Sequence, residues 1–277
     1  MMDLDKEKSM DAQQVALDSV ESTEYSGQQL SAKLESFDSF WEGPEDVEKG
    51  YRTFGQFYRV NYLPHMPANK SAKVLVVSCG PGYFVNLLKQ EGYTNVLGID
   101  SAPEKIEHAL AKNLNCRAEA AFPFLQNTFD QYDVIFCEQE LNHLTKDEMV
   151  EFLKLCWSKM SDSGTLIVHG LNGANPLTGS EALAQNFDHF STFTDYSLKQ
   201  VLLYCGFGEV KIIPLDLYVF YNNPMNYVGK VVTGLLSVLF RVGFVLYGKS
   251  NKIFTKKIGA SCKKQAMGYR PGMGSHA

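Results

Sequence analysis

Short runs of β-branched apolar residues alternate with longer helical patterns from residue 73 onwards, and this alternation constrains the fold more than any other feature. It predicts βαβ units, and therefore a parallel sheet with helices on both faces. The predicted strands are 74–78, 95–99, 132–137, 165–169 and 209–214, and the predicted helices are 83–91, 103–111, 145–160 and 197–205. We expect an α/β fold with a doubly wound, mostly parallel sheet, whose ligand lies at the carboxyl ends of the central strands.

Charge is distributed unevenly along the 277 residues. Residues 1–50 contain thirteen acidic and four basic side chains, whereas residues 217–277 contain nine basic side chains and no acidic one. Such asymmetry predicts an acidic arm and a basic tail. We expect a flexible N-terminal arm over 1–40, a main domain over 41–221 and an apolar, basic extension over 222–277.

Composition narrows the classes of function. The six cysteines show no CxxC or Cys/His metal spacing, and the chain opens with no cationic and apolar signal segment, so we expect a cytoplasmic protein. Glu140 and His143 form a single ExxH pair, which is not a metal site by itself, and no metal is expected. Nucleic acid is disfavoured as a partner because the main domain is not basic. The sequence is also compatible with a homodimer.

A glycine-bracketed turn follows the first predicted strand. Gly80 and Gly82 let the backbone approach a ligand closely, and the helix that begins after them favours negative charge at its N-terminus. Pro81 and Val85 do not fit the dinucleotide pattern GxGxxG, which weakens the pyrophosphate interpretation. Asp100 ends the second strand, where a carboxylate can accept both hydroxyls of a ribose; a helix N-cap is the alternative.

The chain resembles the class I S-adenosylmethionine-dependent methyltransferases in three successive stretches, VVSCGPG, YDVIFCEQELNHL and SGTLIVHG. The resemblance covers residues 51–215. It looks closest to the bacterial branch of ubiquinone-pathway O-methyltransferases and methyltransferases of surface-polysaccharide biosynthesis; HGLNGANPLTGSEALAQNFDHFSTFT is similar to the latter. It implies a Rossmann-like sheet of seven strands and S-adenosyl-L-methionine as cofactor. The implied cofactor-binding residues are Cys79, Gly80 and Gly82 at the methionine end, Asp100 and Ser101 along the ribose, Glu119 in the segment 119–122 beside adenine, and Glu138.

Two positions depart from this family. It usually has an acidic residue at the position of Val76 and a glycine at the position of Ser78. The missing carboxylate normally helps to hold the cofactor's ammonium group. Its loss leaves three alternatives: weaker cofactor binding, replacement by a neighbour such as Glu138 or Glu140, or a protein that keeps the fold, binds partners and no longer catalyses.

Methyl transfer to a hydroxyl needs positioning and one base, and histidine suits that role at neutral pH. His143 follows the fourth strand, and His189 lies in the connection after the fifth, beside Asp188. We take His143 and His189 as the catalytic candidates, although His143 is equally explained as a structural residue. His169 is better explained as a core residue. The Asn- and Gly-rich segment 170–190 suits a sugar, but turn chemistry also explains it.

The most apolar stretch of the chain is 228–248. Lys230 and Arg241 interrupt it, so it would span a membrane poorly. Lys230, Thr233, Gly234, Ser237 and Arg241 fall within about 100° on a helical wheel, which favours a helix in a membrane interface with the basic tail on anionic lipid. A helix packed on the core or in a dimer seam is the alternative. A last antiparallel strand at 253–261 would make this helix an insertion between strands six and seven.

We therefore expect a cytoplasmic, membrane-associated methyltransferase that methylates a hydroxyl of a surface or lipid-linked glycan. A lipid-like or isoprenoid acceptor is the alternative within enzymes, and a catalytically silent binding protein is the alternative outside them.

Overall fold

The structure, a computed structural model, describes residues 44–138, 141–184, 189–217 and 223–265. The arm predicted for 1–40 lies outside these ranges, as do Glu140, Asn186 and Asp188. The boundaries expected between arm, main domain and extension therefore stay predictions.

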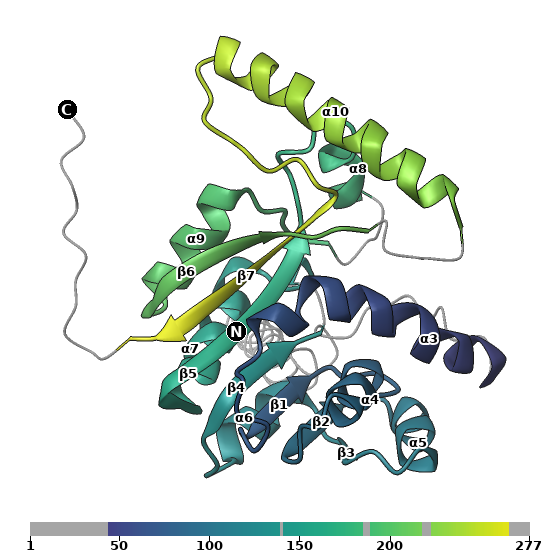
Figure 1. The fold of residues 1–277 in the computed structure, drawn as a ribbon. Coiled ribbons are helices and arrows are strands. Elements are labelled where there is room, and N and C mark those ends of the chain that lie inside the picture. Colours follow the sequence, from purple (N-terminus) through teal and green to yellow (C-terminus); the bar gives the residue numbers. More distant parts are fainter. Residues whose placement is uncertain (1–43, 139–140, 185–188, 218–222, 266–277) are drawn as a thin grey trace, which may run out of the picture.

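A seven-stranded sheet forms the centre of the molecule, in the order β3-β2-β1-β4-β5-β7-β6 (Figure 1). The strands are β1 Val74–Val77, β2 Val96–Asp100, β3 Cys116–Ala118, β4 Tyr132–Cys137, β5 Met160–Leu171, β6 Phe207–Pro214 and β7 Lys257–Lys264. The pairs from β3 to β5 are parallel, and β7 runs antiparallel to both β5 and β6. The predicted mostly parallel, doubly wound fold is confirmed.

Helices cover both faces of this sheet because the buried strands alternate their side chains between the two faces. The helices are α3 Pro44–Asn61, α4 Tyr83–Gln90, α5 Pro103–Ala111, α6 Ala121–Asn127, α7 Lys146–Ser158, α8 Gly179–Ala184, α9 Asp195–Tyr204 and α10 Met225–Leu246, with short 3-10 turns η1 Leu63–His65 and η2 Leu141–His143. Val74 and Val76 pack with residues of α3, α4 and α5, whereas Leu75 and Val77 pack with residues of α6, α7 and α9.

Local signals place several of these helices. The Thr145 hydroxyl accepts from the Glu148 backbone and the Glu148 carboxylate accepts from the Thr145 backbone, which is the predicted capping box of α7. Gly206 follows the C-cap of α9 with a φ of +94°, a conformation that favours glycine.

The last strand is shifted from its predicted position. β7 begins at Lys257, four residues later than expected, because Phe254 is buried against the rings of Phe240 and Phe244 in α10. The predicted insertion of the apolar helix between the sixth and seventh strands is confirmed. Since β6 and β5 both run antiparallel to β7, the carboxyl end of β6 lies at the same edge of the sheet as that of β5. The insertion therefore leaves the sheet at the edge where a ligand is expected.

Candidate active site

The turn between β1 and α4 is an open backbone corner. Gly80 and Gly82 have φ angles of +52° and +81°, and the Gly82 amide donates to the Cys79 carbonyl at 2.8 Å. A Cβ on Gly82 would lie 2.9 Å from the Leu114 side chain, so this position requires glycine. No atom of the described residues lies within 4 Å of the point where a Cβ on Gly80 would be. A ligand can therefore approach the backbone closely at Gly80.

Ser78 stands at the entrance of this corner with a φ of +55°. Residues with a Cβ rarely adopt this left-handed conformation, which costs them about 1–2 kcal/mol. The structure thus explains the glycine usual at this position in the family that the chain resembles. Ser78 adopts the backbone that the corner needs, at a cost in strain.

Asp100 links the turn after β1 to the end of β2. Its Oδ2 accepts from the Gly80 amide at 2.7 Å, and its Oδ1 accepts from the Ala102 amide at 3.0 Å. The side chain is buried. Each carboxylate oxygen has a second lone pair, so this group can hold the turn and still accept from a ligand's hydroxyls. The N-cap of α5 is Ala102, and this helix has no side-chain cap, so Asp100 does not act as its N-cap.

Three other predicted cofactor residues, Cys79, Ser101 and Glu119, differ in how far their side chains are buried. The Cys79 side chain is fully buried, and a hydrogen bond with Cys116 together with burial raises the pKa of its thiol. Because its side chain is buried, Cys79 could face a ligand through its backbone. Ser101 is half-buried and follows Asp100 directly. The Glu119 amide donates to the Asp100 carbonyl at 2.9 Å, so its backbone adjoins the site while its carboxylate is exposed.

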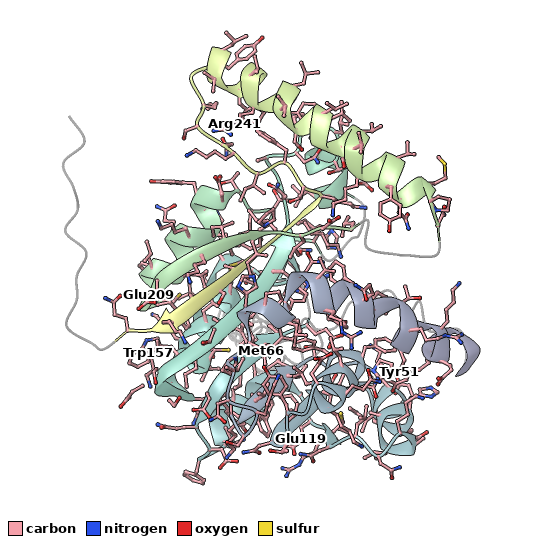
Figure 2. All side chains as sticks on the ribbon, viewed as in Figure 1. Tyr51, Met66, Glu119, Trp157, Glu209 and Arg241 are labelled. Atoms are coloured by element: carbon pink, nitrogen blue, oxygen red, sulfur yellow. The ribbon has the colours of Figure 1, made fainter. Side chains whose placement is uncertain are left out.

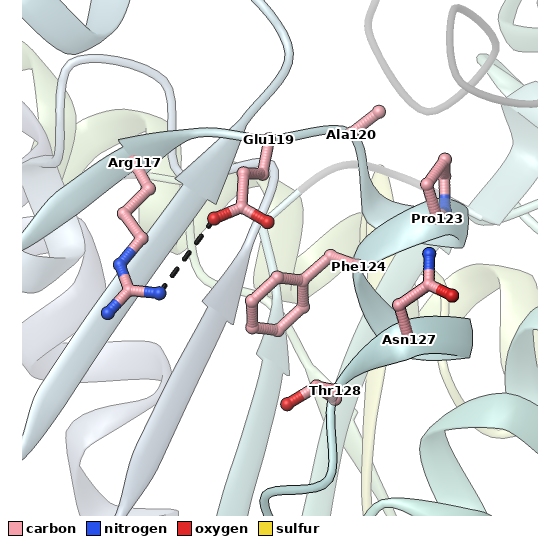
Figure 3. Close-up of a pocket in the computed structure, with 7 residues that line it drawn as sticks. All are labelled: Arg117, Glu119, Ala120, Pro123, Phe124, Asn127 and Thr128. Carbon is pink, nitrogen blue, oxygen red and sulfur yellow. Dashed lines mark ion pairs between the residues drawn. The ribbon is translucent and has the colours of Figure 1, made fainter.

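A pocket of about 360 Å³ lies beside Glu119 (Figure 3). Its other lining residues come from β3 and from α6 with its flanks: Arg117, Ala120, Pro123, Phe124, Asn127 and Thr128. The Arg117 guanidinium lies 3.8 Å from the Glu119 carboxylate across its mouth. The pocket shares Glu119 and Ala120 with the segment 119–122 expected beside adenine, but its lining includes no residue of the glycine corner, so we do not assign it to that corner.

Glu138 follows β4 directly and supplies the second acidic group of the site. Its amide donates to the Val77 carbonyl at 2.9 Å, which places it beside Ser78. Its Oε1 accepts a hydrogen bond from the Tyr58 hydroxyl, whereas its Oε2 is inaccessible to water and has no partner among the described residues. Burial raises the pKa of Glu138 to about 8, against the hydrogen bond from Tyr58, which lowers it. When Glu138 is ionised, this buried oxygen needs a donor, and a ligand's ammonium group would provide one.

Val76 lies in an apolar environment close to this carboxyl group. Val76 is fully buried and pairs in register with Phe136 of β4. Side chains alternate along a strand, so Glu138 continues the face of Phe136 and Val76 one step further. The carboxyl group missing at Val76 thus has a counterpart on the same face of the sheet.

Helix α3 brings two tyrosines to the site that the sequence did not single out. Tyr51, labelled in Figure 2, donates to the Pro81 carbonyl in the glycine corner, and Tyr58 donates to Glu138. Their spacing of seven residues places both on one face of a helix, and this spacing is the signal that could have found them.

The two predicted catalytic histidines lie together. The rings of His143 and His189 meet edge to face, with centroids 4.7 Å apart. His143 is buried and His189 is half-buried. The Nδ1 atom of His189 lies 2.5 Å from the Ala182 carbonyl. Since a carbonyl only accepts, Nδ1 carries the proton of the neutral ring, and Nε2 is then the nitrogen that can take a proton.

His169 belongs to the core, as expected. Its ring lies 5.7 Å from that of Tyr62 and 6.5 Å from that of Phe136.

Asn172 and Asn175 of the following loop have structural contacts. Asn172 donates to the carbonyls of Ile253 and Thr255, and Asn175 donates to that of Phe254, so both tie the loop to the segment before β7. The Oδ1 of Asn172 accepts from the Ala174 amide, and that of Asn175 accepts from the amides of Leu177 and Thr178, which agrees with the turn-chemistry alternative.

Within the described ranges, no group of three or more His, Cys, Asp or Glu side chains is arranged to hold a metal ion. Glu140 of the ExxH pair is outside those ranges.

The part of the chain that contains the glycine corner matches a known family. Residues 74–164 match the model of a family described as a methyltransferase domain, and they include Gly80, Asp100, Glu138 and His143. This stretch of the chain is similar to methyltransferase domains. Among curated proteins, none matches the chain.

Solved structures of methyltransferases share the fold. A SAM-dependent methyltransferase from Archaeoglobus fulgidus is 22% identical with a TM-score of 0.58, over 80% of this chain and 100% of that one. A possible histamine N-methyltransferase from Thermotoga maritima is 14% identical with a TM-score of 0.51, over 80% and 95%. Phosphoethanolamine N-methyltransferase 2 from Haemonchus contortus, solved with S-adenosyl-L-methionine, is 13% identical with a TM-score of 0.51, over 83% and 60%. At these identities the likeness shows the methyltransferase fold and leaves the acceptor open.

Proposed function

We propose that the methyltransferase domain uses S-adenosyl-L-methionine and methylates a hydroxyl group. The unpartnered Oε2 of Glu138 beside the open corner carries this proposal. Glu138 would hold the cofactor's ammonium group in place of the carboxylate missing at Val76. Gly80 and Gly82 would let the backbone approach the methionine end, Asp100 and Ser101 would hold the ribose, and the Glu119 backbone would lie along adenine.

When bound, the cofactor supplies an electrophilic methyl group on a sulfonium, and the acceptor oxygen forms its bond to carbon as the carbon–sulfur bond breaks. The protein must orient the acceptor and remove its proton. His189 is the half-buried member of the histidine pair, and its Nε2 would accept that proton. His143 is buried, and its contact with the ring of His189 would position that ring. The Nδ1 contact with Ala182 fixes the required tautomer of His189.

For the acceptor, we propose a sugar hydroxyl of a lipid-linked glycan. Support comes from the resemblance of segment 169–194 to polysaccharide-associated methyltransferases and from the exposed apolar helix at the ligand edge of the sheet. An isoprenoid or other lipid-like alcohol would be served by the same helix. The structurally similar N-methyltransferases make an amine acceptor a necessary comparison in any assay.

Calorimetric titration with S-adenosylmethionine and S-adenosylhomocysteine tests the cofactor assignment. We expect micromolar binding, about −8 kcal/mol, that is lost in Asp100→Ala and kept in Asp130→Asn, an exposed carboxylate remote from the corner. A folded wild-type protein that binds neither compound would favour the catalytically silent alternative.

The histidine assignment needs a separate measurement. With an acceptor in hand, His189→Gln should lower the methyl-transfer rate by about 10²–10⁴ and leave the affinity for S-adenosylhomocysteine unchanged. His143→Gln should have a smaller effect on the rate. Equal rates for wild type and His189→Gln would remove His189 from the mechanism.

A further inference from the structure

Helix α10 presents an apolar face that the protein itself does not cover. No residue of this helix is buried. Its half-buried positions recur at helical spacing and mark the side turned to the protein: Asn226, Gly229, Thr233, Leu236, Ser237, Phe240, Gly243 and Phe244. Its exposed apolar side chains form the opposite side: Val228, Val231, Val232, Leu235, Val238, Leu239, Val242, Val245 and Leu246. We call this set the α10 face.

Charged and aromatic groups border the α10 face. Lys230 and Arg241 lie along one margin of it, and Lys230 also pairs with Asp216 at 2.6 Å (Figure 2 labels Arg241). Tyr227 and Tyr247 are exposed at the two ends of the helix, and Lys249 and Lys252 follow in exposed positions. No acidic residue occurs after Asp216 in the whole sequence. Tyrosines and cations around an apolar strip match the interface of a membrane with anionic headgroups.

The helix is long and apolar enough to cross a membrane, but its attachments argue against crossing. Residues 248–256 lead from α10 back to β7, and fully extended they would reach about 30 Å, which is the thickness of the hydrocarbon core. Their backbone would then be unpaired in lipid. In the structure this segment is tied to the domain instead: Phe254 packs on Phe240 and Phe244, and Asn172 binds the carbonyls of Ile253 and Thr255. The helix therefore lies along a surface.

We propose that the α10 face is a membrane-docking surface that lies in the headgroup region of an anionic bilayer, with Lys249 and Lys252 on the phosphates. Since α10 is inserted after the carboxyl end of β6, docking would hold the ligand edge of the sheet against the bilayer. In Figure 1 the arrowhead of β5 points towards α8 and α10. This surface is inferred from exposure, charge and topology, so it does not depend on the reaction that the domain catalyses.

Vesicle flotation with the full-length chain tests the proposal. We expect the protein to float with vesicles of phosphatidylcholine and phosphatidylglycerol, and less with phosphatidylcholine alone. The triple variant Val231→Asn, Leu235→Asn, Val242→Asn changes residues that are 63%, 68% and 55% exposed, and should lower partitioning roughly tenfold or more. The matched control is Leu110→Asn, Phe129→Asn, Tyr204→Asn, three exposed apolar residues elsewhere, and it should float like the wild type. Thermal melting followed by circular dichroism checks that each variant is folded.

A second pair of changes tests the charge. Lys249→Glu with Lys252→Glu should abolish the preference for phosphatidylglycerol and leave the apolar face intact. Retention of the protein in vesicles after an alkaline carbonate wash would instead show a spanning helix and overturn the proposal. So would a wild type that stays off vesicles and forms a dimer that the triple variant splits in light scattering, since a second copy would then cover the α10 face. Normal flotation of the triple variant would also overturn it.

Discussion

Glu138 is the residue on which cofactor binding should depend most clearly. Its pKa of about 8 means that the free protein holds it protonated at neutral pH, whereas an ammonium group prefers the carboxylate. Cofactor affinity should therefore rise from about pH 6 to about pH 8, with release of a proton on binding. Glu138→Gln should lose about tenfold to hundredfold in affinity and abolish the proton release, and Glu104→Gln, on exposed α5 surface, should change neither. Calorimetry in buffers of different ionisation enthalpy measures both quantities; equal proton release in Glu138→Gln would contradict the assignment.

Replacing Ser78 by glycine should stabilise the folded protein, whereas most substitutions destabilise a protein. Its φ of +55° is unfavourable for a residue with a Cβ, so Ser78→Gly should raise the free energy of unfolding by about 1 kcal/mol. Ser158→Gly, at the exposed end of α7, should lower it by about 0.5–1 kcal/mol. Urea denaturation gives both values, and a loss of stability in Ser78→Gly would mean that the serine side chain has a role of its own.

At the residue scale, the sequence could identify groups that are close along the chain or follow adjacent strands. Gly80, Gly82 and Asp100 could be singled out because parallel strands bring their carboxyl ends to one edge, and the family resemblance added Glu138. Tyr58 was missed although its seven-residue spacing from Tyr51 marks a helix face, because its partner Glu138 lies 80 residues away in the sequence. Position in a turn did not decide which way the side chain of Cys79 points.

At the scale of elements, α3 packs on one face of the sheet and contacts both the glycine corner and Glu138. Tyr58→Phe removes the hydrogen bond that lowers the pKa of Glu138, so that pKa should rise above about 8. The pH at which cofactor affinity levels off should move up with it. Tyr51→Phe loses only the bond to the Pro81 carbonyl and should leave this pH unchanged. Titrations with S-adenosylhomocysteine at several pH values compare the two, and an identical shift in both variants would argue against a specific pair.

Two of the elements missed from the sequence, β3 and α6, are short or contain a misleading residue. β3 spans only Cys116–Ala118, too few residues to show alternation. α6 contains Pro123, which suggests a loop, yet it lies in the first turn of the helix, where a backbone N–H has no partner within the helix. Most longer elements were predictable because their hydrophobic period repeats enough times to be read, but α3, with 18 residues, was not predicted.

At the scale of the whole molecule, the stability of the fold should respond to pH through Glu138. In the unfolded chain its pKa returns to its ordinary value of 4.5, so between 4.5 and about 8 the native state binds more proton than the unfolded state. The free energy of unfolding should therefore contain a contribution that decreases as pH rises through this window. Denaturation at several pH values should show a shallower decrease for Glu138→Gln than for the wild type. Parallel curves would indicate that Glu138 ionises normally in the folded protein.

The position of β7 within the sheet has a consequence for synthesis. β7 lies between β5 and β6, yet it is the last strand that the ribosome delivers, after the whole of α10. Until it arrives, β5 has an unpaired edge, β6 has no partner among the seven strands, and the apolar helix has already left the ribosome. A growing chain would thus expose strand edges and the apolar helix together, the combination that invites aggregation. Early contact of α10 with a bilayer would cover the apolar helix, whereas the strand edges would stay exposed until β7 is synthesised.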